Sequence, residues 1–454
     1  MKLSSDKEKN ILENEVIFKD PIHDSIHIRH QLILDLIDSK EFQRLRRIKQ
    51  LGTAQYTFHG AEHSRFQHSL GVYELTQIIC DHFVRNYPED WDDSERLVTL
   101  AAALLHDIGH GPFSHTFEKI FHTDHEQFTI DIILDESTEV NQLLKKVAPN
   151  FPTKVASIIK GEYPNPQVVQ LISSQIDADR MDYLQRDAYF TGVTYGMFDL
   201  SRILRVIRPY ENGIAFQYQG MHAVEDYIVS RYQMYMQVYF HPVSRGMEVT
   251  LDRLLTRAKD LYEMGKLYPS APALEAFFKK SVTVHDYLKI DDNILMSIIS
   301  SWTESSDFDL SELAKMFLHR QPLKSIAFDR AKNEKTVQHL QNLVSQLYYD
   351  KDYYSMTNRS SDISYDYSLK EKAPITLIHP NGELIDLSEA SPIVRILSDN
   401  LHGNDRLYVP RDLLRNNPPP QQSLEIFEKI YQEFQRYLIN DRVKNSEELN
   451  EEDS

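Results

Sequence analysis

The stretch His106-Asp107-Ile108-Gly109-His110-Gly111-Pro112-Phe113-Ser114-His115 places three imidazoles and one carboxylate within ten residues. It overlaps the end of a segment, Ser94–Ile108, whose apolar residues recur on one face and whose start offers Asp and Ser as N-cap side chains. Two glycines and a proline then end the predicted helix. His106 and Asp107 are therefore expected on the last turn of a buried helix, where an unpaired carboxylate would be costly. A bound metal cation would account for both side chains.

The remaining metal ligands must come from other segments. Upstream, Arg65-Phe66-Gln67-His68 opens a second apolar helix, expected to run to about Phe83. Downstream, Asp177-Ala178-Asp179-Arg180-Met181-Asp182-Tyr183 carries further carboxylates. Taken alone, His68 reads equally well as a core histidine and Asp179 as a solvated helix residue. Together with the His-Asp pair they form a mixed nitrogen and oxygen set, which suits Mn, Fe, Zn or Mg rather than a closed thiolate site.

At these residues the chain resembles the HD-domain phosphohydrolases, whose His…His-Asp…Asp pattern falls on His68, His106, Asp107 and Asp179. Further stretches resemble the deoxynucleoside triphosphate (dNTP) triphosphohydrolases within that superfamily. They are Phe42-Gln43-Arg44-Leu45-Arg46, Ile48-Lys49-Gln50-Leu51-Gly52, and Asp182-Tyr183 through Arg186-Asp187. The resemblance is strong over Val16–Val243 and loose beyond it. The nearest well-known relatives, in vertebrates, carry an added sterile alpha motif domain, and none is expected before the HD region here.

Composition limits the class of protein further. A chain of 454 residues can bury a large core, and its length allows two or three domains. The formal net charge of −18 argues against indiscriminate nucleic-acid binding. The single Cys80 is expected in the core, excludes an intramolecular disulfide and favours a reducing compartment. Neither a membrane span nor a secretory signal is apparent, so we expect a cytoplasmic protein.

The expected fold is mainly α, a large all-helical HD domain with a smaller mixed α/β C-terminal lobe. A strand over Val16–His23, a strand over Gly213–Gln219, and a hairpin of Pro374–Ile378 with Leu384–Leu387 interrupt the helices. The last helix is predicted over Ser423–Leu438. The expected divisions are a flexible N-terminus (1–15), the HD domain (16–265), a helical and mixed C-terminal lobe (266–440) and an acidic disordered tail (441–454).

Two predicted helices carry polar stripes. Asp179, Tyr183 and Asp187 stand at i, i+4 and i+8, and therefore share one helix face. The second stripe consists of Arg231, Tyr235 and Tyr239 at the same spacing. An apolar stripe at this spacing is usually core, and the two tyrosines of the second stripe fit that interpretation as well. The carboxylates and the arginine favour a polar cavity instead.

The resemblance implies a reaction and a role for each site residue. A metal-bound water would attack the α-phosphate of a dNTP and release deoxynucleoside and triphosphate, with Mg²⁺ accompanying the phosphates. His125 matches the general acid, and a histidine has a suitable pKa for that task. The implied phosphate contacts are Arg65, His110, His115, Arg180 and Arg231. The implied sugar contacts are Gln50, Asp187 and Tyr183, with Tyr235 beside them and with Leu51 and Tyr239 crowding C2′. None of these residues reads a base edge, so broad base tolerance is expected.

The resemblance also implies regulation. Asp38, Gln43 and Arg46 match positions that bind an activating GTP or dGTP between subunits of a homotetramer, and Arg208 matches a basic residue of the adjoining nucleotide site. Without that context, a solvated basic helix face is the simpler interpretation. Gln217 and Gln219 stand where relatives place cations, which argues against a complete second phosphate clamp.

Two alternative functions remain open at this stage. The ligand pattern alone also fits another HD phosphohydrolase, such as a 5′-nucleotidase or a cyclic-nucleotide phosphodiesterase. A nucleotide-sensing regulatory protein with little turnover is the alternative from another class. Arg65, His125, Asp187 and Tyr239 are the residues that favour a dNTP substrate.

Overall fold

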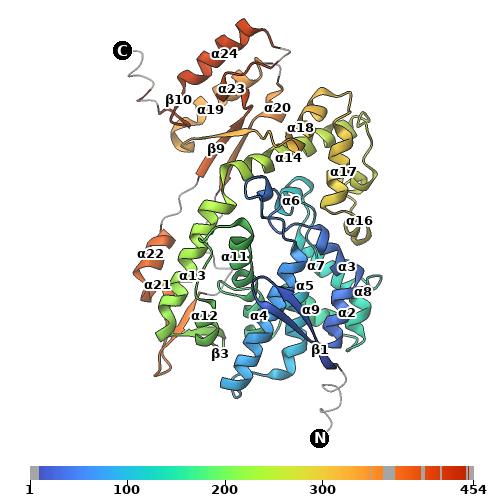
Figure 1. Ribbon diagram of the computed structural model, residues 1–454, viewed down its shortest axis with the longest axis vertical. Helices are drawn as coiled ribbons and strands as arrows, with labels where there is room; N and C mark the ends of the chain where they lie inside the picture. The colour runs from blue at the N-terminus through green and yellow to red at the C-terminus, as the bar shows by residue number, and fades with distance from the viewer. Residues whose placement is uncertain are drawn as a thin grey trace.

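The computed structural model describes residues 10–347, 349–360, 374–399, 404–419, 422–445 and 448. The protein is mainly α-helical, with a smaller mixed α/β region towards the C-terminal end, as the sequence predicted (Figure 1). The helices of the first part are α2 (Gln31–Asp38), α3 (Lys40–Arg44), α4 (Arg65–Asn86), α5 (Arg96–Leu105), α6 (His115–Phe121), α7 (His125–Leu134), α8 (Glu139–Lys145), α9 (Phe151–Ile159), α10 (Pro166–Ile172), α11 (Ala178–Thr191), α12 (Leu200–Val206), α13 (Met221–Met234) and α14 (Pro242–Glu263).

The helices of the second part are shorter on average. They are α15 (Glu275–Phe278), α16 (Val284–Leu288), α17 (Asp292–Trp302), α18 (Phe308–Leu318), α19 (Arg330–Val344), α20 (Lys351–Tyr354), α21 (Leu387–Ala390), α22 (Pro392–Asp399), α23 (Asp412–Arg415) and α24 (Leu424–Arg436). Single turns of 3-10 helix are η1 (Leu45–Arg47), η2 (Ala54–Tyr56), η3 (Asp93–Glu95), η4 (Tyr218–Gly220) and η6 (Pro272–Leu274), and η5 (Tyr235–Tyr239) is π-helical.

The strands of the described residues form three small sheets. They are β1 (Ile11–Asp20), β2 (Asp24–His30), β3 (Ile207–Tyr210), β4 (Gly213–Gln217), β5 (Lys324–Ala327), β6 (Met356–Ser360), β7 (Thr376–Ile378), β8 (Leu384–Asp386), β9 (Asn404–Val409), β10 (Leu438–Ile439) and β11 (Arg442–Val443). The sheet orders are β1-β2, β3-β4-β7-β8 and β10-β11-β5-β9-β6. The predicted hairpin is confirmed as β7-β8, and β7 also pairs in parallel with β4, with Phe216 opposite Leu377.

Local capping explains where the site-bearing helices begin. Ser64 and Gln67 form a capping box at the start of α4, and the Asp177 carboxylate accepts from the backbone N–H of Arg180 at the start of α11. The helix α5 ends at Leu105, three residues before the predicted end, so His106 and Asp107 lie just beyond it rather than on its last turn.

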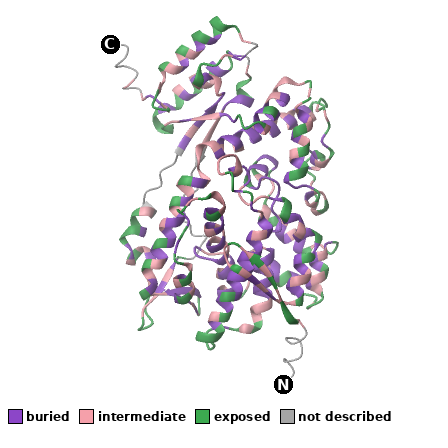
Figure 2. Cartoon of the chain, viewed as in Figure 1, coloured by how far each residue is buried: buried purple, intermediate pink, exposed green. Residues whose placement is uncertain are grey.

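Two hydrophobic cores support the molecule, and Figure 2 shows buried residues in both. The first core is centred on α4, α5 and α9, and it also includes Ile375, Leu377 and Val394 from far along the chain. The second core gathers α14 to α19 and α24, with Phe117 and Phe121 of α6. The segment expected as one lobe (266–440) therefore contributes to both cores, while α6 joins the second.

Short strands lie near both ends of the described part of the chain. The strand β1 begins at Ile11, which pairs with His30 of β2, and an irregularity in the register separates this pair from Val16 opposite Ile28. Likewise β11 occupies Arg442–Val443 inside the expected acidic tail, whose residues 446, 447 and 449–454 lie outside the described part of the chain. None of the described helices combines the length and apolarity needed to cross a bilayer.

Candidate metal centre and active-site pocket

The predicted metal ligands meet where the ends of three helices converge. His68 lies on the first turn of α4, His106 and Asp107 follow α5, and Asp179 lies on the first turn of α11. His68 Nε2 is 3.0 Å from Asp179 Oδ1 and 3.7 Å from Asp107 Oδ2. His106 Nε2 is 3.6 Å from Asp179 Oδ1 and 3.4 Å from Asp107 Oδ1. These separations between donor atoms are those of ligands around one small cation.

The hydrogen bonds of the two imidazoles direct their Nε2 lone pairs into this cluster. His106 Nδ1 donates to the carbonyl oxygen of Ala103 at 2.9 Å, and its buried Nε2 has no hydrogen-bond partner in the described part of the chain. His68 Nδ1 faces Asp182 Oδ2 at 2.8 Å. An imidazole that donates through Nδ1 to a carbonyl or carboxylate presents Nε2 as a metal ligand. The cluster therefore fits a divalent cation.

A buried ion network holds Asp182 behind His68. Its Oδ1 accepts from His23 Nε2 at 2.6 Å, and Arg186 donates to both of its oxygens at 2.8 and 2.9 Å. Arg186 also donates to Asp20 on β1. Burial opposes the charged form, but Arg186, His23 and His68 outweigh it and hold the pKa of Asp182 well below its usual range. The carboxylate thus stays ionised and fixes the ring of His68.

A second cluster, formed by His110, His115, Glu118 and His125, lies beside the first. Glu118 Oε1 is 2.8 Å from His125 Nδ1, and Glu118 Oε2 is 3.0 Å from His115 Nδ1. The rings of His110 and His125 stack at 3.9 Å. Sequence reasoning missed Glu118, although its position three residues after His115 on one helix face was a usable signal.

The surroundings of the second cluster shift the pKa values of the two stacked histidines in opposite directions. Burial opposes protonation of His125, but Glu118 outweighs it and raises the pKa of His125. Burial and the nearby Arg65 guanidinium push the pKa of His110 well below its usual range. His110 is therefore neutral at neutral pH, while Glu118 favours the protonated form of His125.

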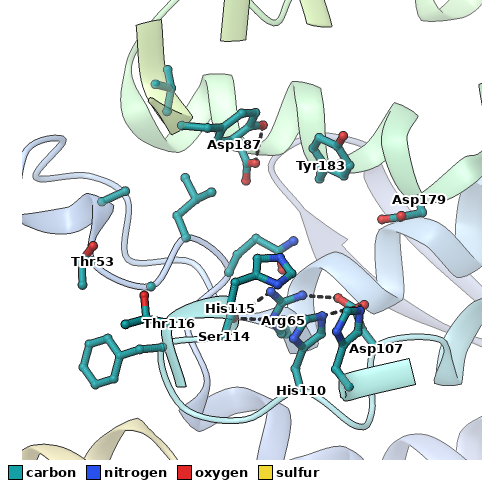
Figure 3. Close-up of a pocket in the computed structure, with 18 of the residues that line it drawn as sticks. Thr53, Arg65, Asp107, His110, Ser114, His115, Thr116, Asp179, Tyr183 and Asp187 are labelled. Atoms are coloured by element: carbon teal, nitrogen blue, oxygen red, sulfur yellow. Dashed lines mark hydrogen bonds and ion pairs between the residues drawn. The ribbon is translucent and has the colours of Figure 1, made fainter. Parts of the chain in front are cut away.

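A cavity of about 540 Å³ opens over both clusters (Figure 3). Arg65 donates to Asp107 and, through Nη2, to Ser114 Oγ at 2.8 Å, which places a guanidinium beside the metal cluster. The expected site residues that line the cavity are Gln50, Leu51, Arg65, His106, Asp107, His110, His115, His125, Asp179, Arg180, Tyr183, Asp187, Tyr235 and Tyr239. His68 and Arg231 are buried behind its wall.

A polar corner of the same cavity surrounds Asp187. Tyr239 Oη donates to Asp187 Oδ2 at 2.8 Å, and His63 Nε2 contacts Asp187 Oδ1 at 2.7 Å. His63 stacks on Phe190, with ring centroids 4.6 Å apart. Gln50 Oε1 is buried without a hydrogen-bond partner among the described residues, so it offers a free acceptor at this corner. Sequence reasoning missed His63, because 124 residues separate it from Asp187.

The helix that carries Arg231 is not regular throughout. The helix α13 ends at Met234, and the π-helical turn η5 then spans Tyr235–Tyr239. Such turns are wider than α-helical ones and often occur at functional sites. The rings of Tyr235 and Tyr239 meet at 5.0 Å with an interplanar angle of 76°. Both tyrosines face the cavity, but the uninterrupted α-helical stripe expected from their spacing is wrong.

Cations around the cavity differ in how fully they are paired. Arg180 bonds Asp177, and Arg231 Nη1 lies 3.5 Å from Gln175 Oε1. In both residues the buried Nε has no hydrogen-bond partner in the described part of the chain. Arg245, which sequence reasoning missed, lines the cavity beside its ion-pair partner Glu248 at 2.7 Å.

The residues expected to bind an effector lie away from this cavity. Gln43 Nε2 donates to the carbonyl oxygen of Ile37, and Gln43 Oε1 accepts from Arg46 Nε at 2.8 Å. The Arg46 guanidinium lies 3.6 Å above the Phe66 ring. Arg208, on β3, pairs with Asp90, and Figure 1 shows β3 well separated from α3 within one subunit.

The family of the chain follows from this fold and site together with comparisons to known proteins. Residues 65–187 match the HD domain, and residues 198–267 match the HD-associated region. The HD match begins at Arg65 and ends at Asp187, so it includes the whole metal cluster. The chain belongs to the HD-domain family, and the matched region contains the His and Asp group that could hold a metal ion.

Comparison with individual proteins shows which members of the family the chain is similar to. The chain is 52% identical over 408 residues to the uncharacterized protein YwfO of Bacillus subtilis, covering 89% of this chain and 94% of that one. It is 27% identical over 410 residues to human deoxynucleoside triphosphate triphosphohydrolase SAMHD1, covering 79% of this chain and 64% of that one. The chicken enzyme of the same name is 29% identical over 346 residues, 67% of this chain and 54% of that one.

A solved structure shares the fold. A phosphohydrolase from Bacteroides thetaiotaomicron superposes with a TM-score of 0.77 at 29% identity, covering 87% of this chain and all of that one. Together with the HD family and the His and Asp cluster, this similarity supports metal-dependent phosphohydrolase chemistry in the pocket.

Proposed function

We propose that this protein hydrolyses deoxynucleoside triphosphates to deoxynucleoside and inorganic triphosphate. The observation that carries the proposal is that one cavity joins the metal cluster to the Asp187–Tyr239 corner. The first feature suits phosphate, and the second suits a sugar hydroxyl. The relatives named dNTP triphosphohydrolases support the same substrate, although the matched region spans 54% to 64% of the chicken and human chains.

His68, His106, Asp107 and Asp179 would hold the divalent ion. Such an ion supplies a bound water of lowered pKa and positive charge beside the phosphoryl oxygens. Arg65 would neutralise negative charge on the same phosphate, since its guanidinium is already fixed against Asp107 and Ser114. Arg180, Arg231, His110 and His115 would contact the phosphates beyond it, with Mg²⁺ as a further counter-ion.

His125 would donate the proton that the reaction needs. The water oxygen would bond to the α-phosphorus and release a proton to solvent, while the bond from that phosphorus to the 5′ oxygen of the sugar would break. The departing alkoxide takes a proton from His125, and the triphosphate leaves intact. Glu118 supports this role because it raises the pKa of His125 and fixes the orientation of its ring.

The Asp187 corner would bind the deoxyribose. Gln50, with its free buried oxygen, and Asp187 would bond the 3′-hydroxyl, with Tyr183 and Tyr235 beside them. Leu51 and the ring of Tyr239 would occupy the space that a 2′-hydroxyl needs. Because Tyr239 bonds Asp187, the same contact that fixes the sugar acceptor also fixes this steric wall.

A guanine nucleotide, GTP or dGTP, would activate the enzyme at an interface between subunits of a homotetramer. Asp38, Gln43 and Arg46 would recognise it, and Arg208 of another copy would complete the adjoining site. The separation of β3 from α3 within one subunit is compatible with a site completed by a second copy. Gln43 and Arg46 bond each other in the present structure, so nucleotide binding would exchange that contact for contacts to the base.

Product analysis tests this proposal. Purified protein, loaded with Mn²⁺ or Mg²⁺, is incubated with each dNTP with and without GTP or dGTP, and the phosphorus products are separated. Triphosphate release is expected. Release of pyrophosphate or orthophosphate instead would indicate another HD phosphohydrolase, and nucleotide binding without turnover would indicate a sensor protein.

A further inference from the structure

One buried carboxylate connects two walls of the active-site pocket. Asp292, on the first turn of α17, accepts from the backbone N–H of Lys49 through Oδ2 at 2.8 Å. It accepts from the backbone N–H of Phe113 through Oδ1 at 3.0 Å. The side chain is almost completely buried, with 4% exposure, and both oxygens are used. A helix of the second core therefore bonds directly to the two segments that carry Gln50 and His110.

The segment bonded through Phe113 has a strained backbone. Phe113 and Ser114 have φ values of 51° and 47°, in the left-handed region that non-glycine residues rarely adopt. Such a conformation persists only where surrounding contacts hold it. Ser114 Oγ accepts from both Nε and Nη2 of Arg65, at 3.2 and 2.8 Å. The strained turn therefore determines where Arg65 meets Asp107.

Lys49, the other residue that Asp292 bonds, lies in a second wall of the active-site pocket. Its neighbours Gln50 and Leu51 line the pocket, and it forms an isolated β-bridge with Ser64, one residue before α4 begins. A shift at Lys49 would thus move the predicted sugar contacts and the start of the helix that carries His68.

A second buried contact acts in parallel with Asp292. Arg44, with 1% exposure, donates to the carbonyl oxygens of His110 at 2.9 Å, Ile290 at 3.0 Å and Tyr287 at 3.4 Å. This guanidinium links the catalytic turn to the residues just before α17. The charged groups that surround Asp292 are therefore two cations, Arg44 and Lys49, and one anion, Asp291.

We propose that Asp292 is a positioning residue for catalysis, which holds the turn at Phe113–Ser114 and the Lys49–Gln50 segment in the one arrangement that aligns Arg65 with the metal cluster. The catalytic part of this statement rests on the proposed hydrolysis, and the structural part does not. Asp292 itself does not line the pocket.

The variant Asp292→Asn tests the proposal with little change of shape. An amide has one acceptor oxygen, so only one of the two N–H groups keeps its partner, while the NH₂ group faces the other donor. We expect kcat for the preferred dNTP at pH 8 to fall roughly 10- to 100-fold, because small misplacements of catalytic groups cost about that much. Metal content should remain that of the wild type, and KM should change less than kcat.

Asp291→Asn is the matched control. Asp291 is the adjacent residue, and its replacement by asparagine removes the same charge. Its carboxylate caps the same helix by accepting from the N–H of Ile294 at 3.0 Å, and it pairs with Arg47. It bonds neither Lys49 N–H nor Phe113 N–H among the described contacts. Its kcat should stay within about threefold of wild type, because asparagine keeps the N-cap acceptor oxygen and only the ion pair with Arg47 is lost. An equal loss in both variants would overturn the proposal.

The pH dependence separates positioning from general destabilisation. Burial raises the pKa of Asp292 to about 6 against the opposing effects of Lys49 and the two backbone donors. Below that pH the wild-type carboxyl is protonated and, like the amide, accepts at one oxygen only. The ratio of kcat in wild type to kcat in D292N should therefore be largest near pH 8 and fall towards one below about pH 6. A ratio that is constant with pH would contradict the proposal.

Hydrogen exchange gives a readout that needs no turnover. In wild type, peptides containing Lys49 and Phe113 should lose protection between pH 8 and pH 5, after correction for intrinsic rates, more than peptides of α5. In D292N at least one of the two peptides should lack the extra protection already at pH 8. Unchanged protection in both experiments would overturn the proposal. If the protection changes occur as expected but the protein releases no triphosphate, only the proposed function is contradicted.

Discussion

His125 Nδ1 lies 2.8 Å from Glu118 Oε1, across the loop that joins α6 to α7. The same carboxylate contacts His115 Nδ1 through its other oxygen at 3.0 Å. Glu118 therefore sets both the orientation and the protonation of the proposed general acid, while the ring of His110 stacks on the ring of His125. A residue outside the recognisable sequence motif thus controls the proton-donating side of the pocket.

Replacing Glu118 by glutamine should move the pH profile. Because Glu118 raises the pKa of His125, and because an acid must be protonated, the alkaline limb of the kcat profile should shift to lower pH in E118Q. At pH 8 the rate should fall by roughly tenfold or more. Asp131→Asn, on α7 and bonded to Gln127, is the control and should keep the wild-type profile. An alkaline limb unchanged in E118Q would contradict the assignment of His125 as the general acid.

Metal binding and proton donation should separate in two histidine variants. His106→Ala removes a proposed metal ligand whose Nε2 has no hydrogen-bond partner among the described residues, so bound divalent metal and turnover should both be lost. His125→Ala should keep the metal and lower kcat by roughly 10²- to 10⁴-fold. Elemental analysis beside steady-state kinetics measures both quantities. Full activity in the first variant, or metal loss in the second, would contradict these roles.

Sugar selectivity should depend on the ring of Tyr239 rather than on its hydroxyl. Tyr239→Ala should open space at C2′ and raise the kcat/KM of GTP relative to dGTP by about tenfold, a loss of discrimination of about 1.4 kcal/mol. Tyr239→Phe keeps the ring but loses the bond to Asp187, so it should weaken dNTP use without admitting ribonucleotides. Equal hydrolysis of GTP and dGTP by the wild type would refute the steric explanation.

Activation by guanine nucleotide should require Arg46. Arg46→Ala removes the group that stacks on Phe66 and bonds Gln43, so added dGTP or GTP should no longer raise dATP hydrolysis or favour a tetramer. Lys40→Ala, at the exposed start of α3, the helix just before the turn η1 that carries Arg46, should respond as the wild type does. Rates of dATP turnover and light-scattering masses at matched protein concentration decide the matter. A full response in Arg46→Ala would remove the effector assignment.

Gly71 should be indispensable to the network behind the metal cluster. A Cβ at this position would collide with the carboxylate of Asp182 and the guanidinium of Arg186. Gly71→Ala should therefore destabilise the protein by about 3 kcal/mol and reduce metal content, since His68 loses its fixed partner. Gly265→Ala, where a Cβ meets nothing within 4 Å, should cost only about 1 kcal/mol through its positive φ. Denaturant unfolding and elemental analysis measure the difference.

The extent to which sequence predicted the site varied with the range of the interaction. His68, His106 and Asp179 could be identified because short motifs mark helix ends, and those ends do converge. The Asp187 corner was predicted in part, since its spacing from Asp179 on α11 is local, but its bond to His63 was not. Glu118 was missed because a single carboxylate at helical spacing has many ordinary explanations.

The sequence by itself determined the helices, the β7–β8 hairpin and the metal-binding residue types, because capping side chains, apolar periodicity and turn residues act over a few neighbouring positions. Only the tertiary structure decided which distant groups meet. It placed β7 against β4, Asp182 behind His68, and Asp292 between Lys49 and Phe113, across up to 243 residues of chain. Such contacts depend on how whole helices pack around two cores, and no local pattern along the chain encodes that packing.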